Sequence, residues 1–210
     1  LHGKHPRPLP KEATLPTAGF YSATLSTTPA FRWPALSPPH PSLLWLAKEQ
    51  LFRPLWSDQI LDEWARSVAR KRTDITAEKL AGHRKEMLDA FEDSMVAGAG
   101  ISLDGLNLPD PKDAHVIETA VIGKADAIVT TNLKHFPPAE LAKVGLEAIH
   151  PDRFLVNLID LDPVRAIGAL KRQRESMTQS NPTIEDYLAR FENCRLIQSR
   201  LKLSEYEELL

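Results

Sequence analysis

The chain has 210 residues, enough for one compact domain of about 150 residues with an appendage. Apolar residues make up 42% of the chain and the net charge is −2, which indicates a globular protein with a core and excludes a basic surface over the whole molecule. Contacts with nucleic acid, where they occur, must therefore be local. The single cysteine, Cys194, excludes an intramolecular disulfide framework and a cysteine-rich zinc site.

The sequence shows neither the pattern of a membrane-spanning segment nor that of a secretory signal. Apolar runs stay well short of the roughly 18 residues that cross a bilayer. The N-terminal residues contain no apolar core of a secretory signal. We therefore expect a cytoplasmic protein that does not contact membranes, in agreement with its single cysteine.

The first 41 residues differ from the rest. They contain nine of the 17 prolines and no Asp. Proline at this density interrupts both helices and central strands. We therefore expect residues 1–41 to form an atypical head that is mostly extended, poorly packed or disordered.

A regular pattern begins at residue 42. Ser57 and Thr76 are typical N-cap residues, and each precedes a stretch with helical apolar spacing. The pattern predicts, in chain order, a helix ending near Gln50, a strand over 52–56, and helices over 57–71 and 76–91.

The next part of the chain alternates helix and strand. Asp110-Pro111 is a favourable helix start, because Asp caps the helix and Pro fits its first turn. The β-branched run over 127–131 is typical of a strand that is buried on both faces, and 146–149 has the pattern of the next strand. This order predicts an α/β fold with a parallel sheet, over residues 42–158.

The C-terminal residues have a different, helical pattern. Two helices are predicted over 163–177 and 184–201, separated by Asn181-Pro182. Thr183 and Asp186 have the spacing of a capping box for the second helix. We therefore expect residues 159–210 to form a helical hairpin appended to the α/β domain.

Candidate site residues follow from the position of strand ends in such a sheet. Ligands of open parallel sheets bind beyond the carboxyl ends of the strands, where Asn132 follows the 127–131 strand. The start of the adjoining helix should lie nearby and presents Asp110 and Asp113. Glu63 lies at the border of the apolar stripe of its own helix, where a carboxylate can point into a cleft.

Each of these residues also has a purely structural interpretation. Asp110 and Asp113 can be helix-start acids favoured by the helix dipole. Glu63 can be a solvated helix acid, and Asn132 a turn residue. His115 and His135 are more often surface or packing histidines than ligands.

Three motifs in the correct order resemble a known family. They are the runs Leu51-Phe-Arg-Pro-Leu-Trp-Ser-Asp-Gln-Ile-Leu-Asp-Glu-Trp64, Leu108-Pro-Asp-Pro-Lys-Asp-Ala-His-Val-Ile-Glu-Thr-Ala120 and Gly123-Lys-Ala-Asp-Ala-Ile-Val-Thr-Thr-Asn-Leu-Lys-His-Phe-Pro137. Over about residues 43–200 the chain resembles PIN-domain ribonucleases, in particular VapC-type toxins with a helical C-terminal extension. The resemblance implies a PIN-like parallel sheet flanked by helices.

The resemblance also implies a function and a site. Such proteins hold Mg²⁺ or Mn²⁺ on clustered acids and cleave RNA, each is paired with a cognate antitoxin, and a homodimer is expected. Carried over by position, Glu63, Asp110 and Asp113 match the metal-binding acids, and Asn132 matches the polar residue after the strand. His135 stands where many relatives carry another Asp.

One part of the family pattern is missing. The family opens with an apolar strand that ends in a metal-binding Asp, whereas no Asp precedes Asp58 here. Either the head is translated from the wrong frame, or the chain is a degenerate member of the family. Both explanations predict an incomplete metal site and a sheet without its central strand. The alternative function is a catalytically inactive PIN-like module that binds a partner protein or RNA.

Overall fold

The computed structural model describes residues 21–25, 41–72, 74–98 and 100–210. Its four strands are β1 (Tyr21–Leu25), β2 (Phe52–Leu55), β3 (Ala127–Val129) and β4 (Glu147–Ile149). The α-helices in the described ranges are α1 (Pro41–Lys48), α2 (Asp58–Lys71), α3 (Ala77–Ala90), α4 (Ala114–Ile122), α5 (Pro138–Leu141), α6 (Pro151–Leu161), α7 (Pro163–Ser176), α8 (Ile184–Asn193) and α9 (Ile197–Ser204). Two of the short 3₁₀ turns matter for the site, η2 (Pro111–Asp113) and η3 (Leu133–His135).

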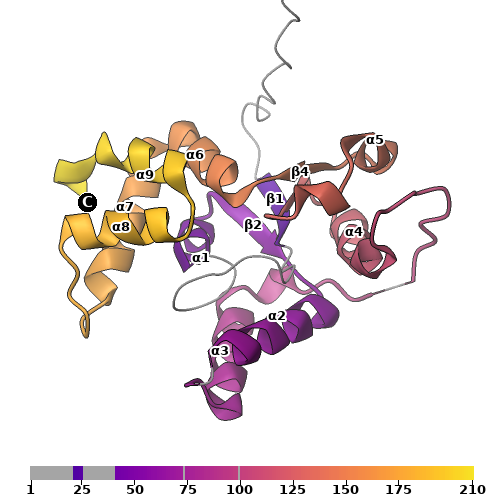
Figure 1. The fold of residues 1–210 in the computed structure, drawn as a ribbon, viewed down its shortest axis with the longest axis horizontal. Helices are drawn as coiled ribbons and strands as arrows, with labels where there is room; N and C mark the ends of the chain where they lie inside the picture. The colour runs from indigo at the N-terminus through magenta and orange to yellow at the C-terminus, as the bar shows by residue number, and fades with distance from the viewer. Residues whose placement is uncertain (1–20, 26–40, 73, 99) are drawn as a thin grey trace, which may run out of the picture.

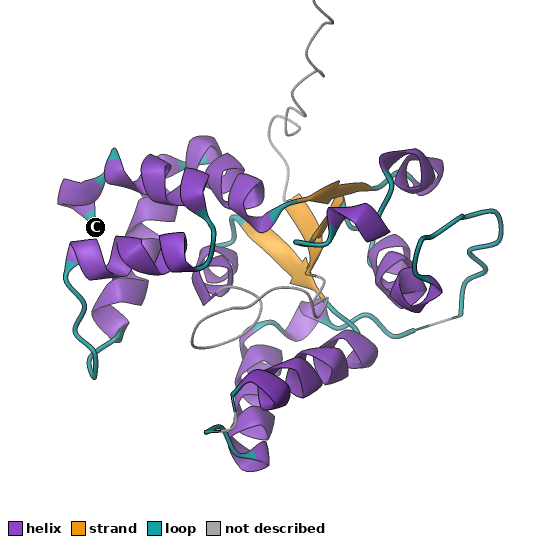
Figure 2. Cartoon of the chain, viewed as in Figure 1, coloured by secondary structure: helices purple, strands orange, loops and turns teal. Residues whose placement is uncertain are grey.

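The sheet is parallel throughout, with the strand order β2-β1-β3-β4 (Figure 2). Its central strand is present, so the expected loss of that strand is wrong: Thr24 pairs with Leu55 of β2, and Leu25 pairs with Val129 of β3. Strand pairing uses backbone groups, and residues 21–25 contain no proline, although proline is dense in the head as a whole. The expectation of disorder for the rest of residues 1–41 concerns residues outside those described, apart from Pro41, which begins α1.

The first helices lie where their capping signals predict. The Ser57 hydroxyl accepts a hydrogen bond from the Ile60 amide at 3.4 Å and caps α2. The Thr76 hydroxyl does the same for α3 through the Lys79 amide. These bonds satisfy amide groups that have no partner within the helix, so the helix starts are set locally.

The hydrophobic core lies on both faces of the sheet. All three residues of β3 are buried, as expected for a strand covered on both sides. The α2 face contributes Ile60, Leu61 and Trp64. The rings of Phe52 on β2 and Phe154 on α6 meet edge to face, with centroids 5.0 Å apart. The core therefore joins the α/β part to the C-terminal helices.

The predicted C-terminal extension is helical, but it is larger than a hairpin. The helix α6 precedes it, and the predicted helix over 184–201 is divided into α8 and α9. The division falls at Arg195, whose φ of 57° is incompatible with continuing a right-handed helix. The helices α6 to α9 gather beside α1 on one side of the sheet, opposite α4 and α5 (Figure 1).

A buried polar network ties this extension to the α/β part. The Gln173 side-chain oxygen on α7 accepts hydrogen bonds from the hydroxyls of Ser42 on α1 and Tyr187 on α8, both at 2.7 Å. Burial raises the pKa of the Tyr187 hydroxyl, so it remains a donor. The extension thus belongs to the same folded unit as the sheet. Within the described ranges, every helix is too short or too polar to traverse a lipid bilayer.

Candidate metal centre

Asp110 and Asp113 are positioned by the turn η2, which precedes α4. The Asp110 carboxylate accepts the Lys112 amide hydrogen bond at 3.0 Å and so caps this turn, with Pro111 in its first position. The predicted helix therefore begins as a 3₁₀ turn and becomes an α-helix only at Ala114. As a result Asp113 lies at the junction of the two, with a side chain only 10% exposed.

His135 is positioned by the end of β3. The Thr130 hydroxyl accepts a hydrogen bond from the Asn132 amide at 3.1 Å, which turns the chain directly after the strand. The Asn132 carbonyl then accepts the His135 amide hydrogen bond at 3.1 Å within η3. Asn132 is itself buried. The turn built on the Asn132 backbone therefore places His135 close to the carboxyl end of β3.

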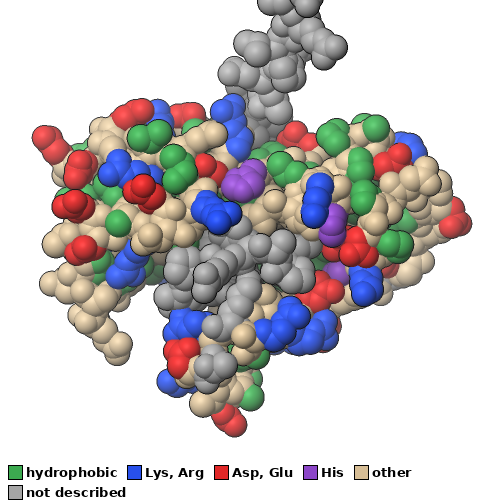
Figure 3. Space-filling view, in the orientation of Figure 1, with side chains coloured by type: hydrophobic (Ala, Val, Ile, Leu, Met, Phe, Trp, Pro, Cys, Tyr) green, Lys and Arg blue, Asp and Glu red, His purple; other side chains and the backbone are tan. Residues whose placement is uncertain are grey.

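These two turns meet at one place. Nδ1 of His135 donates a hydrogen bond to Oδ2 of Asp113 at 2.6 Å. Ligand atoms of Asp110, Asp113 and His135 all lie within 4.8 Å of one another. In the space-filling view, histidine and acidic side chains adjoin beside α4 (Figure 3).

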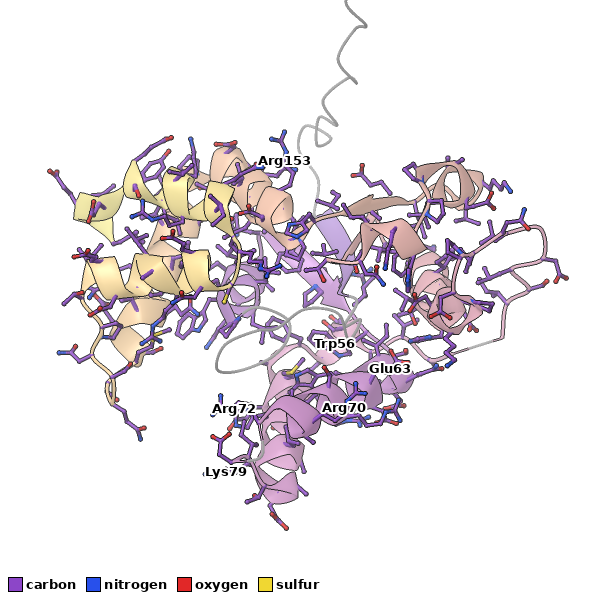
Figure 4. The ribbon with its side chains drawn as sticks, in the orientation of Figure 1. Trp56, Glu63, Arg70, Arg72, Lys79 and Arg153 are labelled. Atoms are coloured by element: carbon purple, nitrogen blue, oxygen red, sulfur yellow. The ribbon has the colours of Figure 1, made fainter. Side chains whose placement is uncertain are left out.

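Glu63 contacts a different histidine. On the side of α2 that faces α4 (Figure 4), its Oε2 atom lies 3.3 Å from Nε2 of His115. Nδ1 of His115 donates to the Lys112 carbonyl at 2.7 Å. Burial by itself lowers the pKa of His115, but the Glu63 carboxylate and the Lys112 carbonyl outweigh burial and raise that pKa above its ordinary value.

The donor set fits a divalent cation. Two carboxylates offer the hard oxygen ligands that Mg²⁺ and Mn²⁺ accept, and the imidazole offers a nitrogen ligand. Partial burial of the three side chains strengthens their interaction with a cation, because screening by water is reduced. The residues present are therefore suited to hold one ion.

The predicted residues are only partly brought together. Asp110 and Asp113 lie in one cluster, and Asn132 lies in the turn that leads to it. Glu63 is not in the group of ligand atoms within 4.8 Å and contacts His115 instead. The sequence favours packing or surface roles for His115 and His135, whereas in the fold His115 contacts Glu63 and His135 contacts Asp113. For His135 the signal was available, because it stands at a position where relatives carry Asp.

Comparisons with known proteins agree with this architecture. Residues 32–134 match the family described as "PIN domain", and residues 151–205 match the family described as "VapC50 C-terminal domain". The two matches follow one another along the chain in the order of the α/β part and the helical extension.

The chain is therefore a PIN-domain protein. It is of the VapC type, with a VapC50 C-terminal domain as its helical extension. One similar protein is the "Putative ribonuclease VapC50" of Mycobacterium tuberculosis (strain ATCC 25618 / H37Rv), which is 52% identical over 50 residues. That stretch covers 24% of this chain and 30% of the relative, so the match spans less than a third of the relative's length. No solved structure matches the chain.

Proposed function

We propose that the chain is a metal-dependent endoribonuclease and the toxin of a toxin–antitoxin pair. One observation carries the proposal: Asp110 and Asp113 from one turn meet His135 from another, at the carboxyl end of a central parallel strand. Ligand sites of open parallel sheets occur at this edge. The similarity to a protein described as a ribonuclease supports the same activity.

The proposed roles follow from the position of each residue. Asp110 and Asp113 would hold Mg²⁺ or Mn²⁺, and Glu63 would add an acid from α2, next to His115. A bound divalent ion supplies positive charge at the scissile phosphate and makes water more acidic. The Asn132 backbone stabilises the η3 turn through two hydrogen bonds. We propose Asn132 as the fourth residue of the catalytic site, with Glu63, Asp110 and Asp113.

Basic residues flank the acids. Lys112 and Lys134 are both exposed, and each adjoins a residue of the cluster in sequence. We propose that they contact RNA phosphates, which gives affinity with little choice of sequence. The RNA would be single-stranded or looped, because side chains cannot read bases in the narrow major groove of an RNA duplex.

The cleavage assay uses the full chain with labelled single-stranded RNA and Mn²⁺ or Mg²⁺. We expect metal-dependent cleavage that Asp113→Asn reduces by about 10²–10³-fold, since one electrostatic stabiliser is lost. Asp93→Asn is the matched control, because Asp93 is exposed on the 3₁₀ turn Glu92–Ser94. Equal cleavage by Asp113→Asn and the unchanged chain would contradict the assigned site.

A second candidate function is a catalytically inactive PIN module that binds a partner protein or RNA. The sequence of β1, Tyr-Ser-Ala-Thr-Leu, favours it, because this central strand carries no acid. The discriminating variant replaces the residues up to Leu25 with an apolar strand that ends in Asp. Cleavage by the replaced chain alone would indicate an ancestral nuclease that lost its first ligand, whereas cleavage by the unchanged chain excludes the inactive module.

The proposed partners are a cognate antitoxin and a second copy of the chain. A small antitoxin would cover the acidic site and stop cleavage. We expect co-expression with the antitoxin to yield a stable complex that does not cleave RNA. Light scattering on the free chain tests the proposed homodimer, and a monomer over the micromolar range would exclude it.

A further inference from the structure

One face of α2 continues from Glu63 as a line of basic residues. Arg66 and Arg70 follow Glu63 by three and seven positions, a spacing that places all three residues on the same face of the helix. Both arginines are exposed. Figure 4 shows Glu63 and Arg70 along α2, and Figure 3 shows basic side chains gathered over this helix. Because Glu63 lies 3.3 Å from His115 at the start of α4, this basic line begins beside the candidate metal centre.

The positive charge of these two arginines is not neutralised by ion pairs. The acids in the first turns of α2, Asp58 and Asp62, pair instead with Arg84 of α3 at 2.6 and 2.5 Å. Among the described residues, neither Arg66 nor Arg70 forms an ion pair. The chain as a whole carries a net charge of −2, so this basic line is a local feature and not part of a general basic surface. It therefore offers a binding surface to an anionic ligand.

The spacing of the two arginines fits an extended polyanion better than a compact anion. At about 1.5 Å per residue, the Cα atom of Arg66 lies about 4.5 Å beyond that of Glu63 along the helix axis, and that of Arg70 about 10.5 Å beyond it. The two arginines therefore follow one another at about 6 Å, a separation comparable with that of successive phosphates in one nucleic-acid strand. Guanidinium groups bind phosphates through paired hydrogen bonds. A strand with one phosphate at the metal centre can thus contact both arginines with its next phosphates.

We propose that Arg66 and Arg70 bind backbone phosphates of single-stranded RNA and guide the strand along α2, away from the metal centre. The inference rests on the proposed function for the identity of the ligand, and it adds the path that the strand takes. Phosphate contacts of this kind position a nucleic acid without reading its sequence. Basic grooves that track the backbone are typical of proteins that bind single strands. The arginines of α2 thereby hold the nucleotides next to the one at the metal centre.

The first test measures binding of a short, labelled single-stranded RNA of mixed sequence to the full chain by fluorescence anisotropy. Divalent ions are chelated, so that the RNA stays intact. We expect the double variant Arg66→Gln/Arg70→Gln to bind about tenfold or more weakly at about 0.1 M salt, and the slope of log affinity against log salt to become shallower by about 1.4, since each phosphate contact on a single strand contributes about 0.7.

The matched control removes the same charge from the C-terminal helices. Lys171 and Arg190 are both exposed, on α7 and α8 respectively. The double variant Lys171→Gln/Arg190→Gln should keep the RNA affinity and the salt slope of the unchanged chain. Circular dichroism establishes that both double variants are folded, which is expected because all four side chains are exposed.

The second test locates the RNA directly by photocrosslinking. The variant Arg70→Cys carries a thiol-linked photocrosslinker at residue 70. The natural cysteine, Cys194, is buried, and burial raises the pKa of its thiol to about 11, so the reagent should react at residue 70. We expect crosslinks to single-stranded RNA from this position, because Arg66 still holds the strand nearby. The same reagent at residue 171, in Lys171→Cys, should give none.

A protein partner with an acidic segment is the rival ligand of this surface. It would leave the RNA affinity and salt slope of Arg66→Gln/Arg70→Gln unchanged, and this result in the folded variant would overturn the proposal. An equal loss of affinity in the Lys171→Gln/Arg190→Gln control, or crosslinks of equal yield from residues 70 and 171, would overturn it as well.

The outcomes separate this inference from the proposed function. RNA that is bound through Arg66 and Arg70 but stays intact with Mn²⁺ or Mg²⁺ would support the inference and remove the nuclease activity. Metal-dependent cleavage by a chain whose RNA affinity does not depend on the two arginines would do the reverse.

Discussion

Asp113 and His135 share a hydrogen bond of 2.6 Å although 22 positions separate them in the sequence. Asp113 ends η2 at the start of α4, and His135 ends η3 after β3. The helix α4 leads into β3 and lies antiparallel to it, so the start of the helix and the end of the strand meet at one edge of the sheet. This contact is therefore a consequence of the α/β topology and not of local sequence.

The variant Asp110→Asn should separate metal binding from folding. Asn caps a helical turn about as well as Asp, so stability without metal should change by less than about 0.5 kcal/mol. The loss of charge should instead remove the rise in melting temperature caused by Mn²⁺, which corresponds to about 2.7 kcal/mol at a hundredfold excess over Kd. Differential scanning calorimetry with and without Mn²⁺ measures both. A variant that keeps the full Mn²⁺-dependent rise would show that Asp110 is not a ligand.

Gly123 should not tolerate a side chain. A Cβ atom there would lie 2.8 Å from Cδ1 of Leu55 and 2.9 Å from Cγ2 of Val96. Gly123→Ala should therefore lower the free energy of unfolding by about 1–3 kcal/mol, the usual effect of overpacking. Urea denaturation measures the change.

The matched control for this substitution is Gly82→Ala, which should have the opposite sign. A Cβ atom at Gly82 meets no atom within 4 Å, and the residue lies inside α3. Alanine there should raise the free energy of unfolding by about 0.5–1 kcal/mol, because glycine is a weak helix former. If both substitutions change stability alike, the close packing around Gly123 is not the cause.

Asp152 on α6 should stabilise the C-terminal helices. Its buried carboxylate accepts hydrogen bonds from the Gln198 and Ser199 amides at 3.0 and 2.8 Å and from the Ser199 hydroxyl at 2.6 Å. Asp152→Ala leaves the donors of Ser199 buried without this acceptor, so the free energy of unfolding should fall by about 1–3 kcal/mol or more.

Asp160→Ala on the same helix is the control for Asp152. Asp160 is exposed and pairs with Lys202 at 3.1 Å. Exposed ion pairs contribute little, so this change should cost less than about 1 kcal/mol. Thermal unfolding of both variants gives the comparison, and a larger loss for Asp160→Ala would refute the assigned role of Asp152.

His150 should make stability depend on pH. Burial lowers its pKa from the ordinary 6.5, although the Asp152 charge opposes this shift. Its Nδ1 atom also accepts the Asp152 amide hydrogen bond at 3.2 Å, which requires the neutral ring. When the pH falls below 6.5, His150 binds a proton in the unfolded chain before it does so in the folded chain. The free energy of unfolding that neutral His150 contributes above this pH therefore decreases, until the pH reaches the lowered pKa of His150 in the folded chain.

The variant His150→Asn tests this pH dependence. Asn can cap α6 but does not titrate near neutrality. Between pH 7 and pH 5 the unchanged chain should lose more unfolding free energy than the variant, as measured by guanidinium denaturation at each pH. Parallel pH profiles for the two chains would assign the pH dependence to other groups.

Much of the fold could be predicted from short stretches of sequence. Ser57 and Thr76 set the starts of α2 and α3, because the capping hydrogen bond joins residues three apart. The run Ala127-Ile-Val129 has the composition of a doubly covered strand and is one. The strand β1 could not be predicted in this way, since Tyr21–Leu25 lies within a proline-rich head and is defined by its partners Phe52–Leu55 and Ala127–Val129.

In the candidate site, too, some residues could be chosen from the sequence, whereas some contacts are known only from the fold. The acids Asp110 and Asp113 could be chosen from the sequence, because a helix start and a strand end meet in a parallel α/β fold. For His135 the sequence offered one signal, the resemblance that places it where many family members carry Asp. That Glu63 contacts His115 instead of the cluster could not be predicted, since this contact depends on how α2 packs against α4. The division of α8 from α9 at Arg195 is, by contrast, a local turn, in which the Leu196 amide donates to the Phe191 carbonyl at 2.8 Å.

The sequence by itself determined the order of helices and strands, the caps that begin the helices and the acids available for a cation. These features depend on neighbours within one or two turns, whose interactions are the same wherever the segment lies. Only the tertiary structure decided which side chains meet, because contacts such as Asp113–His135 and Asp152–Ser199 depend on how distant segments pack. A cation site is defined by the separation of its ligand atoms, and that separation is fixed only when the sheet and its helices have assembled.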